Sequence, residues 1–157
     1  TISREFGSGG RFIGEQIAQK CGIEFYDKKI IEHVAKELGI SEQIVANQGE
    51  YAPAGSIFSY AFVGRDITGV SLSDQIFNIQ QKLIKDIAQK EPCVIVGRCA
   101  DYILSDRDDV LNVFIEGNKP EKAARIKKLY HKSDDEVKKL LKDVYKKLSV
   151  NYRYFTD

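Results

Sequence analysis

The stretch that decides the fold is TISREFGSGGRFIGEQIAQKCG, residues 1–22. A short β-branched run leads into a glycine cluster at 7–10, and apolar residues at helical spacing follow it. A glycine loop between a strand and a helix presents backbone N–H groups and the positive end of the helix dipole to one point, which suits a phosphate. Glycine allows the positive φ of such a turn and the close approach of an anion.

The loop differs from the full phosphate-loop pattern, G-x-x-x-x-G-K-[ST], whose lysine reaches the terminal phosphates and whose hydroxyl binds Mg²⁺. Arg4 stands at the position of the first glycine, and Gly9-Gly10-Arg11 replaces the last three residues of the pattern. Taken alone, the loop is therefore either a phosphate site or a tight structural turn.

Length and composition indicate one domain. The chain has 157 residues, of which 43% are hydrophobic, enough for a single buried core. With 24 Lys+Arg against 23 Asp+Glu the net charge is +1, so no global field favours nucleic acid or an anionic membrane. The Lys-rich segment 134–147 carries interleaved acids and is interpreted as a solvated face. Any anion site must be local, and no nucleic-acid partner is expected.

Localisation and redox chemistry follow from what the sequence lacks. No apolar run approaches the ~20 residues that span a bilayer, and no leader resembles a signal peptide. We expect a cytoplasmic protein with no membrane partner. Three cysteines without paired spacing support neither a disulfide framework nor a zinc site, and no metal-ligating residues are predicted. Cys21 and Cys93 are expected to be small buried apolar residues, and the oligomeric state is left open.

Strand and helix patterns alternate along the chain. Helices are predicted over 10–21, 29–38, 41–49, 73–90, 118–130 and from 133 onward, and strands over 1–3, 23–26, 93–96 and 110–115. The first helix is expected to bury Ile13, Ile17, Ala18 and Cys21, with Gly14 allowing close packing on a sheet. Asn118 and Ser133 are predicted to cap the last two helices. The helix over 73–90 is expected to bury an apolar stripe formed by Ile76, Ile79, Leu83, Ile84 and Ile87. The order of strands and helices predicts a three-layer α/β/α fold with a mostly parallel sheet, and the last strand is expected to be missing.

Ligands of such folds bind beyond the carboxyl ends of the strands. Three features collect there: the glycine loop 7–10, Asp27 after the second strand and Arg98 after the third. The segment 51–73, rich in Gly, Ala, Ser and aromatic residues, is interpreted as a ligand-covering insertion on the acceptor side.

Two blocks of sequence resemble a known family. SREFGSGGRFIGEQIAQKCGIEFYD at 3–27 and CVIVGRCADYIL at 93–104 are similar to the cytidylate kinase-like family, relatives of the P-loop nucleoside monophosphate kinases. The resemblance extends over nearly the whole chain, and the lysine-free loop is that family's usual form. It implies a P-loop kinase-like fold and ATP-dependent phosphoryl transfer to a nucleotide, with Mg²⁺ bridging the donor phosphates and a basic lid closing over them.

The resemblance implies that the donor phosphates of ATP bind the loop and the first helical residues. The residues concerned are Gly7, Ser8, Gly9, Gly10 and Arg11. Arg11 is the candidate catalytic cation in place of lysine, since a planar guanidinium suits phosphate oxygens, or it is a solvated helix arginine. Ser8 contacts a phosphate oxygen or only holds the turn.

The acceptor region is expected around Asp27, Arg65, Arg98 and Asp101. Asp27 orients the acceptor or a metal-bound water, or caps the following helix. Arg98 resembles the arginine that true cytidylate kinases use for the acceptor monophosphate and is the second catalytic candidate. The competing interpretation is an ion pair with Asp101. Arg65 is a weaker candidate.

The region 118–157 is expected to form a lid with cations from Arg125, Lys147 and Arg153. For its end, the alternative is a helix that packs Leu148 and Val150 into the core. The rival to a kinase is a nucleotide-binding or sensing module that has kept the fold and lost the chemistry, because Gly10 occupies the lysine position. The acceptor base is not predicted.

Overall fold

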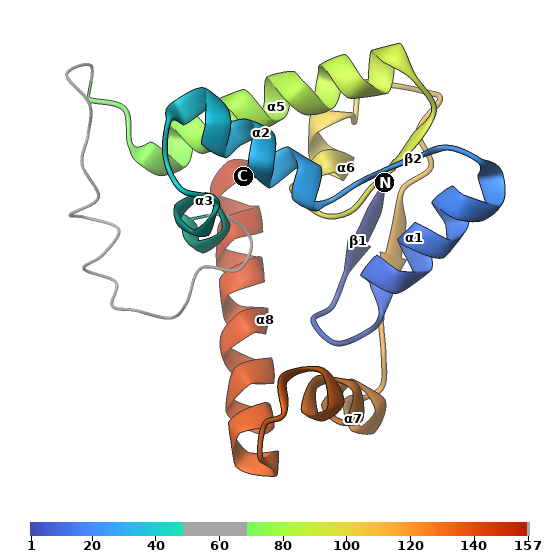
Figure 1. The fold of residues 1–157 in the computed structure, drawn as a ribbon, viewed down its shortest axis with the longest axis vertical. Coiled ribbons are helices and arrows are strands. Elements are labelled where there is room, and N and C mark those ends of the chain that lie inside the picture. The colour runs from blue at the N-terminus through green and yellow to red at the C-terminus, as the bar shows by residue number, and fades with distance from the viewer. Residues whose placement is uncertain (49–68, 157) are drawn as a thin grey trace.

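The computed structural model describes residues 1–48 and 69–156, and every structural statement below concerns those residues (Figure 1). The chain alternates short strands with helices. In order, the elements are β1 (Ile2–Arg4), α1 (Gly10–Cys21), β2 (Glu24–Tyr26), α2 (Lys28–Leu38), α3 (Glu42–Gln48), α5 (Leu72–Lys90), β3 (Cys93–Ile95), α6 (Ala100–Ile103), β4 (Val113–Ile115), α7 (Lys119–Tyr130) and α8 (Asp134–Thr156).

The strands form two small parallel pairs, β1 with β4 and β2 with β3. A parallel bridge between Ile2 and Val96 joins the pairs, so β1 lies between β4 and the end of β3. All four carboxyl ends therefore point the same way, as the predicted α/β class requires. The strand predicted over 110–115 is shorter than expected, because the three residues of β1 pair only with Val113–Ile115.

Helix α1 lies directly on the strands through its smallest residues. The buried positions are four residues apart: Gly10, Gly14 and Ala18. A Cβ on Gly14 would stand 3.0 Å from Val96 Cγ2, so the helix backbone itself touches the sheet, as predicted. Of the residues expected on the buried face, only Ala18 is buried. The helix approaches the strands along Gly10 and Gly14, and this orientation turns the other three expected residues toward solvent: Ile13, Ile17 and Cys21.

The main core forms between α2, α3, α5 and α6. Helix α5 begins one residue earlier than predicted, where Ser71 accepts a hydrogen bond from the Asp74 amide at 3.2 Å. Of its apolar stripe, Ile76, Ile84 and Ile87 are buried as expected, whereas Ile79 and Leu83 are partly buried against the core. One polar residue, Gln80, is buried with them. Of the cysteines, Cys93 is half-buried and Cys99 is buried.

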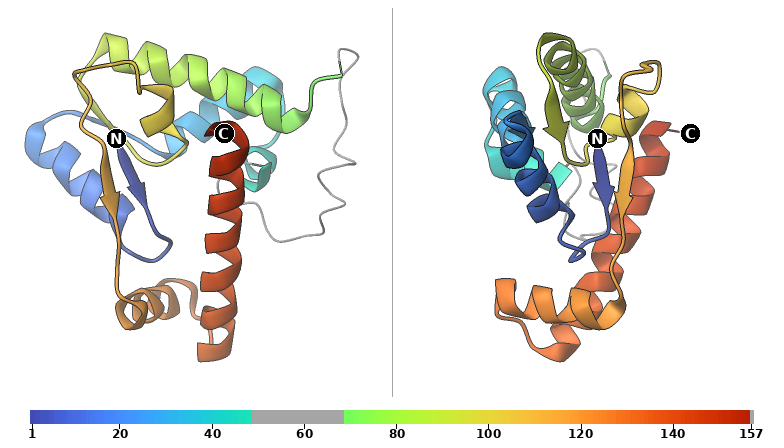
Figure 2. Two further views of the ribbon diagram at one scale, coloured as in Figure 1. Left: turned by 180° about the vertical axis from the view of Figure 1, so that it is seen from behind. Right: turned by 90° about the vertical axis from the view of Figure 1, so that its right-hand side faces the viewer.

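The helices lie on both sides of the strands (Figure 2, right): α1 and α2 on one side, α6 and α8 on the other. Helix α7 lies beyond the carboxyl end of β1, next to the start of α8 (Figure 1). Both predicted caps are present. Asn118 Oδ1 accepts from the Glu121 amide at 2.9 Å, and the Ser133 amide donates to the Glu136 carboxylate at 2.9 Å. That backbone bond is the largest cause lowering the pKa of Glu136 to about 2.

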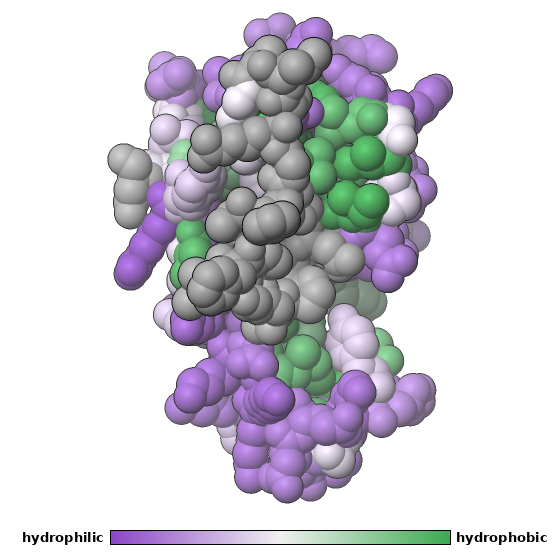
Figure 3. Space-filling view, turned by 90° about the vertical axis from the view of Figure 1, so that its left-hand side faces the viewer, coloured by the Kyte–Doolittle hydropathy of each residue, from purple (hydrophilic) through white to green (hydrophobic). Residues whose placement is uncertain are grey.

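The end of the molecule formed by α7 and the start of α8 is hydrophilic on the face shown in Figure 3, whereas apolar residues gather toward the other end. Within 1–48 and 69–156, no helix combines the length and the hydropathy that crossing a bilayer demands.

Candidate functional site

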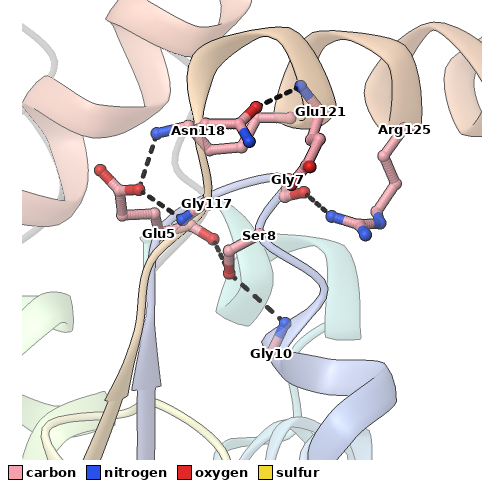
Figure 4. Close-up of polar contacts among 9 residues, drawn as sticks. Glu5, Gly7, Ser8, Gly10, Gly117, Asn118, Glu121 and Arg125 are labelled. Carbon is pink, nitrogen blue, oxygen red and sulfur yellow. Dashed lines mark hydrogen bonds and ion pairs between the residues drawn. The ribbon is translucent and has the colours of Figure 1, made fainter.

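The glycine loop turns sharply between β1 and α1. Gly7 and Gly9 adopt φ values of 82° and 90°, which other residues rarely adopt. The buried Ser8 Oγ donates to the Glu5 carbonyl at 2.8 Å and accepts from the Gly10 amide at 3.4 Å (Figure 4). In this structure the Ser8 hydroxyl therefore holds the turn.

Glu5 ties the loop to the segment that leads into α7. Its Oε2 accepts from Lys122 Nζ at 2.7 Å and from the Gly117 amide at 3.2 Å. The Lys122 hydrogen bond is the largest cause lowering the pKa of Glu5, against the opposing effect of burial. The loop and the start of α7 are thus fixed to each other by a charge-assisted contact.

Arg125 of α7 faces the loop. Its Nη1 donates to the Gly7 carbonyl (Figure 4), and a Cβ on Gly9 would stand 3.2 Å from its Cζ. A Cβ on Gly7 would stand 2.8 Å from Ile126 Cδ1. Gly7 leaves room for the Ile126 side chain and Gly9 leaves room for the end of the Arg125 side chain, so α7 packs closely against the loop. The structure brings Arg125, predicted as a lid residue, to the predicted phosphate loop.

Arg11 and Asp27, predicted for donor and acceptor respectively, form an ion pair. Arg11 Nε lies 2.8 Å from Asp27 Oδ2, with side-chain exposures of 49% and 6%. Asp27 stands at the N-cap position of α2, but its side chain makes no capping hydrogen bond, so the expected cap was wrong. The carboxylate turns to α1 because the neighbouring guanidinium offers a stronger, charge-assisted contact.

A cavity of about 450 Å³ opens beside the carboxyl end of β1. Its walls come from the ends of β1 and β4, from the turn after β3, and from α5, α6 and α8. Three predicted site residues line it: Arg98, Asp101 and Arg153. The cavity also borders Arg4 and Glu5, at the start of the glycine loop. Lys147, also predicted for the lid, is not among the lining residues.

Arg98 lies in an unusual turn after β3 and is only 3% exposed. Its φ of 61° follows 69° at Gly97 and precedes 54° at Cys99, so three consecutive residues are left-handed. Gln80 Nε2 donates to the Arg98 carbonyl oxygen at 3.0 Å.

The end of α8 is fixed across the cavity by aromatic residues. Tyr152 donates to Asp101 Oδ2 at 3.0 Å. Burial, and then this hydrogen bond, raise the pKa of Tyr152 to about 12. The Phe155 ring stacks on Phe77 at a centroid distance of 4.0 Å. Leu148 lines the cavity and Val150 is exposed, so the alternative to a lid, in which Val150 packs into the core, is wrong for that residue.

Two predictions, for Arg65 and for the segment 51–73, cannot be compared with the structure. Arg65 and most of the segment 51–73 lie outside the described residues. Among the residues that are described, no three His, Cys, Asp or Glu side chains gather to hold a metal ion.

Sequence reasoning missed Glu5, Gln80 and Tyr152. For Gln80 the signal was present: it stands four residues from both Ile76 and Ile84, in the middle of an apolar stripe. Glu5 and Tyr152 contact partners more than fifty residues away in the sequence, which no local pattern indicates.

A parallel α/β fold whose first strand runs through a glycine loop into the first helix defines a class of proteins that present this loop to ligands. Within that class, the chain belongs to the cytidylate kinase-like family, whose sequence profile matches residues 1–157. The resemblance of the two sequence blocks is thereby confirmed.

Among the solved structures that are similar to this chain, one matches nearly its whole length. It is described as an uncharacterized protein from Eubacterium ventriosum ATCC 27560, with 26% sequence identity and a TM-score of 0.71. The match covers 98% of this chain and 74% of that one. No curated protein matches the sequence.

Proposed function

We propose that this protein transfers a phosphoryl group from ATP to a nucleoside monophosphate, using a three-layer P-loop kinase-like fold. The observation that carries the proposal is the placement of two arginines about the end of β1. Arg125 faces the glycine loop, and the buried Arg98 lines the cavity that borders Arg4 and Glu5. Two cationic centres on one strand end suit a donor and an acceptor phosphate, because phosphoryl transfer is accelerated mainly by positioning and charge stabilisation.

On the donor side, the amides of the loop and the N-terminus of α1 bind phosphate oxygens. Arg125 supplies the positive charge that lysine supplies in the full motif, once its guanidinium moves from the Gly7 carbonyl to the nucleotide. The alternative cation, Arg11, is held through its Nε by Asp27. This favours Arg125 over Arg11 as the donor-side arginine.

On the acceptor side, the cavity has the volume of a small-molecule site, for which about 300–1,000 Å³ is usual. Burial of Arg98 strengthens its attraction for an anion, because little water screens the charge. Arg153 adds a second positive charge on the opposite wall, and Asp101 adds a hydrogen-bond acceptor.

A magnesium ion carried by ATP would neutralise the charge that develops on the donor phosphates. Magnesium keeps several waters and needs only one or two protein carboxylates. Asp27, buried beside α1, fits as the group that accepts hydrogen bonds from such waters, with Arg11 fixing its orientation.

One observation favours a second candidate, a nucleotide-binding module without catalysis. A Cβ on Gly10 would stand 2.6 Å from Arg4 Cβ, so no side chain fits at the lysine position unless Arg4 moves. The loop therefore binds phosphate without the group that assists transfer in the full motif.

The test is incubation of the protein with Mg-ATP and each of the four common nucleoside monophosphates, followed by ADP release. Turnover that depends on one acceptor and is lost in Arg98→Ala, but kept in Lys128→Ala on the exposed side of α7, supports the kinase. Thermal stabilisation by ATP without turnover supports the binding module. If the protein shows no turnover and ATP does not stabilise it, both the kinase and the binding module are ruled out.

A further inference from the structure

Gln80 is a polar residue in an apolar setting. It lies on the buried face of α5 between Ile76 and Ile84, and is 6% exposed. Burial of an amide side chain is unfavourable unless its polar atoms are hydrogen-bonded. A leucine at this position would continue the stripe, so packing alone does not account for the glutamine.

The hydrogen bond of Gln80 goes to a backbone group in a disfavoured conformation. Its Nε2 donates at 3.0 Å to the carbonyl of Arg98, the middle residue of the left-handed run from Gly97 to Cys99. A left-handed conformation costs about 1–2 kcal/mol for each residue other than glycine. Such turns persist only where surrounding contacts hold them, and they gather at functional sites.

The turn determines where the Arg98 side chain lies. The chain leaves β3, reverses through the three left-handed residues and enters α6, with the Ala100 amide donating to the Gly97 carbonyl at 3.1 Å. Gln80 and Arg98 both line the cavity of about 450 Å³. A relaxed turn would carry the guanidinium away from the position it has there.

We propose that Gln80 is a positioning residue that holds the Arg98 backbone left-handed and thereby presents the Arg98 guanidinium to an anion in this cavity. The identity of that anion, the phosphate of a nucleoside monophosphate, rests on the proposed function. The role of Gln80 itself rests on the hydrogen bond, the burial and the three φ values.

The first test is a double-mutant cycle of Gln80→Leu with Arg98→Ala, measured by calorimetric titration with each of the four monophosphates and with ATP. Gln80→Leu should weaken monophosphate binding about five- to tenfold, the value of one hydrogen bond, and leave ATP binding unchanged. In the Arg98→Ala background the same change should alter monophosphate affinity less than about twofold, because a residue that acts through Arg98 has nothing left to position. Gln89→Leu, on the exposed side of α5, is the matched control.

Conservative variants separate the hydrogen bond from packing. Gln80→Met keeps a similar size but loses the N–H donor and should bind as weakly as Gln80→Leu, whereas Gln80→His keeps a donor and should recover part of the affinity. Equal losses in the wild-type and Arg98→Ala backgrounds, or no loss in Gln80→Leu, would overturn the proposal.

A crystal structure of Gln80→Leu, or of Gln80→Met if the leucine variant does not fold, decides the proposal even if the wild-type protein binds no monophosphate. If the wild-type protein binds no monophosphate, the proposed function fails. The role of Gln80 is still supported if Arg98 leaves the left-handed region in the variant structure. It is overturned if the φ of Arg98 and the position of its side chain are the same in the variant as in the wild type.

Discussion

Substitution of Gly9 by alanine distinguishes between two interpretations of the glycine loop: a phosphate-binding loop, and a turn that only connects β1 to α1. The new methyl group would occupy a residue with φ of 90° and stand 3.2 Å from Arg125 Cζ. The arginine end can shift by the few tenths of an ångström this needs, so the expected cost is the left-handed strain, about 1–2 kcal/mol of unfolding free energy. For a chain of this size that lowers Tm by roughly 2–8 °C.

The effect on ATP should be larger than the effect on folding. The methyl group holds a phosphate away from the loop amides and would break about two charge-assisted hydrogen bonds, a loss of about 3 kcal/mol or roughly a hundredfold in Kd. At ATP a hundredfold above the wild-type Kd, stabilisation by ligand would fall from about 2.7 to about 0.4 kcal/mol. The ATP-induced Tm shift would then fall from roughly 5–11 °C to about 1–2 °C.

The assay is thermal unfolding with and without Mg-ATP for wild type, Gly9→Ala and Gly39→Ala. Gly39 ends α2 with φ of 64° and has no atom within 4 Å of an added Cβ, so its variant carries comparable backbone strain far from the loop. It should lose stability and keep the full ATP shift. A folded Gly9→Ala that also keeps the full shift would refute phosphate binding by the loop.

Three further outcomes are expected. Arg98→Ala should weaken monophosphate binding by about 1.5–3 kcal/mol and spare ATP, as calorimetry of both ligands would show; equal losses would indicate a role in folding. The hydrogen bond from Lys122 is the main cause that lowers the pKa of Glu5 below its ordinary value of 4.5. The ionised Glu5 therefore adds its full contribution to the free energy of unfolding above pH 4.5, and this contribution is lost as the pH falls through the lowered pKa of the folded protein. Urea unfolding should therefore show wild type more stable than Glu5→Gln by about 1.5 kcal/mol at pH 7. This difference should shrink as the pH falls below 4.5, and a difference that does not change with pH would contradict the ion pair. Tyr152→Phe should speed amide hydrogen exchange over 145–154, because it removes the hydrogen bond to Asp101 that holds the end of α8. Unchanged exchange would mean that this hydrogen bond does not hold the helix. A bisubstrate analogue should slow exchange in the same segment if the segment is a lid.

The sequence predicted the elements well because their signals are local. The glycine loop, the Asn118 cap and the apolar stripe of α5 each depend on residues within a few positions of one another, and all three are present. The buried face of α1 was wrong because packing on the strands, a tertiary effect, favours Gly10 and Gly14 over the larger Ile13 and Ile17.

The structure places several of the proposed site residues near one another, but the sequence did not predict their pairings. Arg98 and Asp101 do line one cavity, and Arg125 does reach the glycine loop. The contact of Arg11 with Asp27 was not foreseen, because it joins the first turn of one helix to the end of a strand through the packing of α1. Ion pairs between distant segments depend on side-chain directions that residue spacing does not encode.

The position of β1 within the sheet has a consequence for synthesis. This strand is synthesised before β3 and β4, yet Ile2 forms its bridge with Val96 and pairs with Val113, both of which are made much later. Until then its edges have no strand to join, and unpaired edges of slow-forming parallel sheets invite association with other chains. We therefore expect a nascent chain halted before β4 to remain sensitive to protease, and to gain resistance abruptly once β4 and α7 have emerged.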